Sequence, residues 1–190
     1  MEACDDIMAV INKPNFKELT NGAFFDPSTI VPNEDEHSKF IQLDFGICKD
    51  ENGALTPKLI ELQGFPSLYY FQELLGRKYL QHFGNVIPEG FSQHLNGMTS
   101  IDYLDRLKHE IVGNTNPKQV ILLEIEPEKQ ATAVDFYATA KVLGIKVLCI
   151  TDLKKRGKTL FYLDENGSEV EVIKIYNRII FDELDQRTDL

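Results

Sequence analysis

The segment that most constrains the fold is a helix enclosed by two short apolar runs. Residues 118–126 read KQVILLEIE and residues 145–152 read IKVLCITD, and both runs are typical of strands buried on both faces. Residues 127–143 lie between them, with Pro127 in the first turn and Gly144 just past the end, which favours a helix. A helical crossover joins parallel strands through a right-handed connection, so the sequence predicts an α/β fold with a parallel βαβ unit.

Residues 40–63 predict a β-hairpin closed by the turn Asp-Glu-Asn-Gly at residues 50–53. Apolar and polar residues alternate on both sides of this turn, as in strands that place one face against a core. Gly53 suits the positive φ of such a turn. The alternation groups residues on common faces as follows: Gln42 with Asp44, Leu59 with Glu61 and Gln63, and Ile60 with Leu62. We expect this hairpin and the parallel strands to form a mixed sheet.

Helices are expected at three further places, because apolar residues recur there at helical spacing. They cover residues 1–12, 67–84 and 99–113, and Ser67 is the expected N-cap of the second. A second Asp-Glu-Asn-Gly turn predicts another hairpin over residues 158–176.

Residues 13–39 have few periodic apolar positions and several Pro and Gly residues, so we expect an irregular segment there. Phe24 and Phe25 are expected to pack this segment onto the domain. The chain is therefore interpreted as an N-terminal arm over residues 1–39 followed by an α/β domain over residues 40–190.

Charge and cysteine content limit the partners and the compartment. The net charge of −10 argues against a nucleic-acid backbone or an anionic membrane as partner. The start of the chain has no signal-peptide pattern, and no stretch is long and apolar enough for a membrane span. Cys4, Cys48 and Cys149 are far apart in sequence, and this usage suits a reducing cytoplasm. Cys48 and Cys149 lie within apolar strand patterns, so we expect them to be packed thiols.

The polar face of the first hairpin is the strongest candidate site. Opposite residues of a hairpin lie about 5 Å apart at Cβ, so Asp44 and Glu61 repel each other unless a proton, a cation or a basic group neutralises them. Mg²⁺ commonly binds one or two carboxylates and completes its shell with water and phosphate oxygens. Gln63 adds a neutral oxygen, and Gln42 adds a hydrogen-bonding group. The alternative is an edge hairpin whose polar face only meets water.

Two stretches of this hairpin resemble a known family. QLDFG at residues 42–46 and PKLIELQGFPSLY at residues 57–69 resemble the metal-binding hairpin of the circularly permuted ATP-grasp enzymes, the glutathionylspermidine synthase-like group. In that group an Asp on one strand and Glu-x-Asn on the next hold the Mg²⁺ that bridges the phosphates of ATP. The resemblance implies that Asp44 and Glu61 are metal ligands and that Gln63 stands at the Asn position.

The chain departs from the family pattern at two positions. The family usually has Arg two residues before the Asp, where this chain has Gln42, and Gln63 is one methylene longer than Asn. The resemblance also implies that Gln42 and Ser67 touch phosphate or substrate. Residues 118–182 resemble the family more loosely.

The resemblance implies ATP-dependent ligation of a carboxylate to an amine, with Mg²⁺ and ATP as cofactors. The family's nucleotide clamp follows the segment seen here, so we expect this chain to be the N-terminal part of a longer protein, to work with the rest of that parent chain, and to be inactive alone. The alternative function is a non-catalytic module that binds a small ligand or a partner.

A second candidate site lies where the parallel strands end, because open parallel sheets bind ligands beyond the carboxyl ends of their strands. Glu126 and Asp152 follow the two predicted strands. Arg178 follows another apolar run and is a candidate for binding an acidic substrate or for reaching Asp44 and Glu61. The alternative is that these three charged residues are ordinary surface residues.

Overall fold

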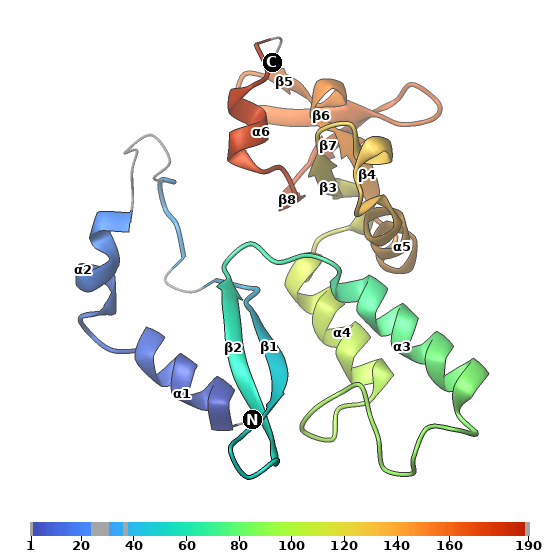
Figure 1. Cartoon of the computed structure of the whole chain (residues 1–190). Coiled ribbons are helices and arrows are strands. Elements are labelled where there is room, and N and C mark those ends of the chain that lie inside the picture. Colours follow the sequence, from blue (N-terminus) through green and yellow to red (C-terminus); the bar gives the residue numbers. More distant parts are fainter. Residues whose placement is uncertain (1, 24–30, 36–37, 189–190) are drawn as a thin grey trace. The chain divides into compact units, whose positions relative to one another are not determined.

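The computed structural model describes residues 2–23, 31–35 and 38–188 (Figure 1). The chain divides into two compact units, Met1–Pro66 and Ser67–Leu190. The expected arm and the hairpin therefore belong to the same unit. Phe24 and Phe25, expected to pack the arm onto the domain, lie outside the described residues. None of the helices in the described ranges has the length and apolar character needed to cross a membrane.

The first unit contains short helices and one hairpin. Helix α1 (Glu2–Ile11) confirms the helix expected at the start of the chain. Within the segment expected to be irregular, the chain forms a five-residue helix α2 (Phe16–Thr20) and a single 3₁₀ turn η1 (Asn21–Ala23). The hairpin consists of β1 (Gln42–Lys49) and β2 (Leu55–Gln63), which pair antiparallel as predicted.

The two Asp-Glu-Asn-Gly turns have the same hydrogen bonds. In the first turn, Asp50 Oδ1 accepts from the backbone N–H groups of Asn52 and Ala54, both at 2.8 Å. In the second turn, Asp164 Oδ1 accepts from the N–H groups two and four residues later, at 2.9 and 2.8 Å. Gly53 and Gly167 have φ of 80° and 77°, which a residue with a Cβ rarely adopts. The local sequence therefore sets both turns.

The second unit alternates helices with short strands. Its elements in chain order are α3 (Tyr69–Phe83), α4 (Ser100–Ile111), η3 (Pro117–Gln119), β3 (Val120–Glu124), η4 (Pro127–Lys129), α5 (Ala133–Leu143), β4 (Lys146–Cys149), η5 (Ile150–Asp152), β5 (Lys154–Arg156), β6 (Thr159–Leu163), β7 (Glu169–Val172), β8 (Lys174–Asn177) and α6 (Phe181–Asp185).

Strand β3 is the centre of a parallel sheet with the strand order β4-β3-β8. The pairing of β3 with β4 is parallel, with α5 between them in the chain, which confirms the predicted βαβ unit. Strand β8 pairs parallel with the other edge of β3. The sequence placed residues 174–176 in the second hairpin, and this was wrong, because β8 leaves β7 and joins β3 instead.

Among residues 2–23, 31–35 and 38–188, the strands form three separate sheets. The hairpin β1-β2 is a two-stranded sheet, and β5-β6-β7 is an antiparallel sheet of its own. The α/β class is therefore correct, but the expected mixed sheet that joins the hairpin to the parallel strands is not formed.

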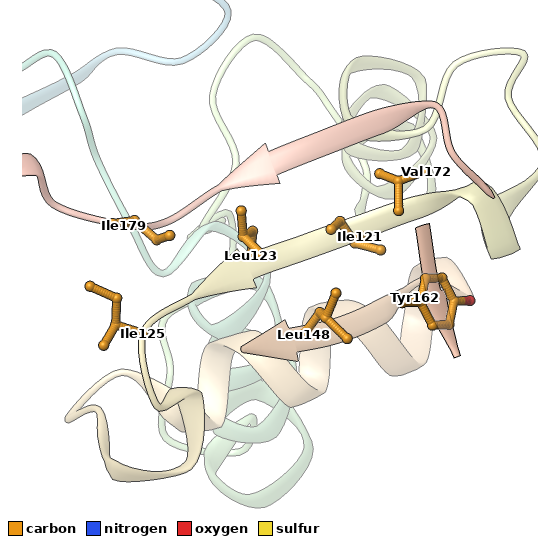
Figure 2. Close-up of a cluster of buried hydrophobic side chains, with 7 residues drawn as sticks. All are labelled: Ile121, Leu123, Ile125, Leu148, Tyr162, Val172 and Ile179. Carbon is orange, nitrogen blue, oxygen red and sulfur yellow. The ribbon is translucent and has the colours of Figure 1, made fainter. Parts of the chain in front are cut away.

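One face of the parallel sheet packs against side chains of the antiparallel sheet, and Figure 2 shows the buried cluster to which both contribute. Ile121 and Leu123 of β3 and Leu148 of β4 form a buried cluster with Tyr162 of β6 and Val172 of β7. The Tyr162 hydroxyl also donates to the Lys118 carbonyl at 2.9 Å, so its polar end is satisfied where the sheets meet.

The N-termini of α3 and α4 are capped in different ways. Thr99 and Asp102 form a capping box on α4, because each side chain accepts a hydrogen bond from the other residue's backbone N–H. Ser67 was predicted to cap α3, and this was wrong: α3 begins after Leu68, which has φ of 68° and makes no side-chain cap. Asp135 of α5 accepts from the Phe71 N–H at 2.9 Å and supplies the cap instead.

We expect truncation of the central strand to cost much of the stability of the second unit. Ile121 has an exposed fraction of 0 %, so Ile121→Ala should lower the free energy of unfolding by about 2–5 kcal/mol and Ile121→Val by about 0.5–1.5 kcal/mol. Val134 of α5 is 51 % exposed, and Val134→Ala is the matched control. Urea unfolding followed by circular dichroism measures both. Equal losses for the Ile121→Ala and Val134→Ala variants would contradict this core.

Candidate functional site

The hairpin brings its predicted polar residues together. Asp44 is directly opposite Glu61, and Gln42 is directly opposite Gln63. Opposite residues of an antiparallel pair share a face, and so do residues two apart on one strand. All four side chains therefore lie on one face, which confirms the predicted pairing.

One amide group joins the two carboxylates. Gln63 Nε2 donates to Asp44 Oδ2 at 3.0 Å and to Glu61 Oε1 at 2.7 Å. Gln42 Nε2 donates to the second oxygen of Asp44 at 2.9 Å. Two side-chain amides thus supply the donors that offset repulsion between the two negative charges.

A β-bulge changes the faces of two apolar residues. The register shifts after Asp44, so that Phe45 faces Leu59 and Ile60 is the extra residue. Leu59 therefore lies on the face opposite to Glu61, although the alternation grouped these two residues. A Cβ added at Gly46 would lie 3.7 Å from the Ile60 side chain, which places Ile60 on the Asp44 face. Strict alternation failed here because a bulge is not visible in the period-two pattern.

Asp44 and Glu61 are the side chains on this face that would hold a Mg²⁺ ion. The Gln63 nitrogen contacts one oxygen of each carboxylate, so one central position is already shared by both groups. The distance from Mg²⁺ to a ligand oxygen is about 2.0–2.1 Å. The Asp44 and Glu61 side chains are half-buried and exposed, so they have room to move to this distance from a shared ion. Within residues 2–23, 31–35 and 38–188, no three His, Cys, Asp or Glu side chains gather as ligands. The remaining ligands would be water, phosphate or an amide oxygen.

The other predicted site residues all belong to the second unit. Ser67 is half-buried, and its hydroxyl has no hydrogen-bond partner among the described residues. Glu126 and Asp152 follow β3 and β4 as predicted and are both exposed, and Glu126 pairs with Lys129 at 2.6 Å. Arg178 is only 7 % exposed, so it is not a surface arginine.

Arg178 lies at the carboxyl edge of the parallel sheet. Its backbone N–H donates to the Leu123 carbonyl at 2.9 Å, which extends the pairing of β8 with β3. Its guanidinium carbon is 5.6 Å from the ring centroid of Tyr176. Burial raises the pKa of nearby Tyr69 to about 12, and the positive charge of Arg178 partly opposes that rise.

Two buried acids near this edge were missed by the sequence reasoning. Glu124 ends β3 at 4 % exposed and accepts from the Ile125 N–H at 2.7 Å. Asp135 is 1 % exposed and caps α3 from α5. Burial raises the pKa of both carboxyls, and the backbone hydrogen bond that each accepts opposes the rise. Each of these acids stands alone within an apolar run of the sequence. That pattern was the available signal, because an acid that must be buried with its apolar neighbours needs a partner.

Comparisons with known proteins give no match: no family model matches the chain, and neither a curated protein nor a solved structure is similar to it. The site must therefore be interpreted from its own residues.

We expect stability to depend on pH through Asp135. Its pKa is raised in the fold, so between the ordinary carboxyl pKa of about 4 and the raised value the folded state binds more protons than the unfolded chain. The proton bound by the folded state therefore stabilises the fold fully at pH below the ordinary carboxyl pKa. This stabilisation is lost as pH rises through the raised pKa of Asp135. Asp135→Asn keeps an oxygen that accepts from the Phe71 N–H and removes this titration.

Urea unfolding between pH 3 and 8 tests the expectation. The Asp135→Asn variant should unfold with a higher free energy than the wild type at neutral pH, and the difference should vanish at low pH. Asp135→Ala also removes the acceptor, and it should lower the free energy of unfolding by about 1–3 kcal/mol at low pH, where the wild-type carboxyl is neutral. A pH-independent difference between the wild type and the Asn variant would show that Asp135 does not titrate in this range.

Proposed function

We propose that this chain supplies the magnesium-binding hairpin and a substrate-side α/β region of an ATP-dependent carboxylate–amine ligase. The observation that carries the proposal is the pair of opposed carboxylates, Asp44 and Glu61, that share one amide donor on the open face of β1 and β2. The order of a metal hairpin followed by a parallel βαβ unit supports the same class.

The proposed reaction has two steps. A substrate carboxylate oxygen attacks the γ-phosphorus of ATP, and ADP leaves as the acyl phosphate forms. The amine nitrogen then attacks the acyl carbon, phosphate leaves, and the amine loses a proton as the amide forms. Mg²⁺ would neutralise charge on the phosphate oxygens during the transfer.

The polar residues of the hairpin and Ser67 have roles in this proposal. Asp44 and Glu61 would hold Mg²⁺, and Gln63 would offer its amide oxygen as a further ligand. Gln42 and Ser67 contact phosphate or substrate. The adenine-binding clamp would come from other parts of a longer parent chain.

A second candidate function is non-catalytic binding of a small ligand at the carboxyl edge of the parallel sheet. Glu124 and Arg178, both nearly buried, favour it, because the interior of a protein rarely holds charges without a structural or binding role. Glu126 and Asp152 would form the exposed part of that rim. A ligand with an acidic group would bind Arg178.

We expect Mg²⁺ to bind the hairpin weakly by itself, since the ion lacks phosphate oxygens to complete its shell. Titration with Mg²⁺ should shift the backbone amide signals of Gln42–Asp44 and Glu61–Gln63 in nuclear magnetic resonance spectra. Asp44→Asn and Glu61→Gln should each abolish the shifts.

The matched control is Glu51→Gln, which removes an equal charge from the exposed turn of the same hairpin. It should leave the Mg²⁺ shifts unchanged. If the control weakens binding as strongly as Asp44→Asn does, the ion is attracted by the general negative charge, and the proposed site is wrong.

We expect Mg-ATP to bind this chain more weakly than the low micromolar range, which corresponds to about 8 kcal/mol of binding free energy. Two carboxylates and two amides provide no positive charge for the phosphates. Titration calorimetry measures this, and low-micromolar binding would show that these 190 residues hold a complete nucleotide site.

In the full-length protein, ADP release with panels of carboxylates and amines tests ligation itself. Arg178→Ala should raise the KM for the acidic substrate, and Arg178→Lys should restore part of the loss. No ADP release with any acid and amine, together with normal Mg²⁺ binding, would favour the second candidate function.

A further inference from the structure

Helix α3 carries a buried glutamate that belongs to neither candidate site. The Glu73 side chain is 0 % exposed, and the side chain of Arg77 one turn later is 43 % exposed. Arg77 Nε lies 3.2 Å from Glu73 Oε1 but is not oriented to donate to it, and this oxygen has no hydrogen-bond partner among the described residues. Arg77 therefore offsets the charge of Glu73 without satisfying it fully.

The loop between α3 and α4, residues 84–99, supplies the remaining partners. His94 Nε2 lies 2.8 Å from Glu73 Oε2, and the imidazole is 10 % exposed. Gln93 Nε2 donates to the same oxygen at 2.6 Å. The backbone hydrogen bonds described for this loop are local turns, such as Phe91 N–H to the Pro88 carbonyl. Gln93 and His94 thus attach this loop to α3 through the Glu73 carboxylate.

A glycine in α3 makes room for this attachment. A Cβ at Gly76 would collide with the carboxamide of Gln93. Gln93 therefore occupies a notch that exists only because α3 has no side chain at that position. The notch and the carboxylate together form a docking place for the loop.

Helix α4 covers the other side of the imidazole. The rings of His94 and Tyr103 are 5.2 Å apart at their centroids, with an interplanar angle of 32°. Burial raises the pKa of Tyr103, so its hydroxyl stays neutral when histidine titrates. A cavity of about 140 Å³ is lined by Gln72, Glu73, Gln93, His94 and Tyr103. It has room for several water molecules that can exchange protons with the imidazole.

We propose that His94 and Glu73 form a proton-controlled latch that holds the loop of residues 84–99 against α3 and α4. The ionisable side chains in contact with the imidazole are Glu73 from α3 and Tyr103 from α4, and Arg77 is paired with Glu73. Histidine is the side-chain type that gains or loses a proton near neutral pH. A protonated imidazole donates a charge-assisted hydrogen bond to the carboxylate, which is about twice as strong as a neutral one. Loss of that proton loosens the loop.

Hydrogen exchange of the amides of residues 85–98, expressed as protection factors at pH 5.5 to 8, tests the latch. Protection should fall roughly fivefold as pH rises, the factor expected between charge-assisted and neutral hydrogen bonds. His94→Gln keeps a side-chain donor, so its loop should show low protection that does not change with pH. Gly76→Ala displaces Gln93 but leaves every titrating group, so it should lower protection at all pH values and keep the slope.

The matched control is His109→Gln, which replaces an exposed histidine on α4. It should retain both the protection and the pH dependence of the wild type. Wild-type protection that does not vary with pH, or a pH dependence that disappears in the His109→Gln variant, would overturn the proposal.

Discussion

The second unit depends on a strand that has no exposed side. All five residues of β3 are buried, and both of its edges pair, with β4 on one side and β8 on the other. Backbone groups in such a position need hydrogen-bond partners, so the chain must return a strand to each edge. Parallel partners require long connections, and α5 and the β5-β6-β7 sheet lie within those connections. The layers around β3 follow from this requirement.

Three acidic side chains of the second unit are buried, whereas the facing acids of the hairpin are not. Glu73, Glu124 and Asp135 are buried in the second unit, and each accepts a hydrogen bond from a neighbouring group. These bonds offset the cost of burying a carboxylate. Asp44 and Glu61 instead remain half-buried or exposed, so they keep access to ions from solvent. The interior acids therefore hold elements of the fold together, whereas the hairpin acids remain accessible to solvent.

A glutamine amide donates to carboxylates both in the hairpin and at Glu73 of α3. Gln63 donates to the two hairpin carboxylates, and Gln93 donates to Glu73 in the notch of Gly76. A neutral amide is a modest donor, so a stronger charge can replace it or outweigh it. This property is common to the two proposals: an Mg²⁺ ion would take the position of the Gln63 amide nitrogen, and an imidazolium beside Gln93 would strengthen the loop contact.

The sequence by itself determined features that depend on a few neighbouring residues. The two Asp-Glu-Asn-Gly turns, the facing pair Asp44 and Glu61, and the βαβ unit were all predictable, because turn chemistry and hydrophobic period act locally. Only the tertiary structure decided which distant groups meet. Asp135 caps α3 across 64 residues, and β8 joins β3 rather than the hairpin before it. His94 lies on Glu73 for the same reason. These contacts depend on how elements pack in space, and no local pattern carries that information.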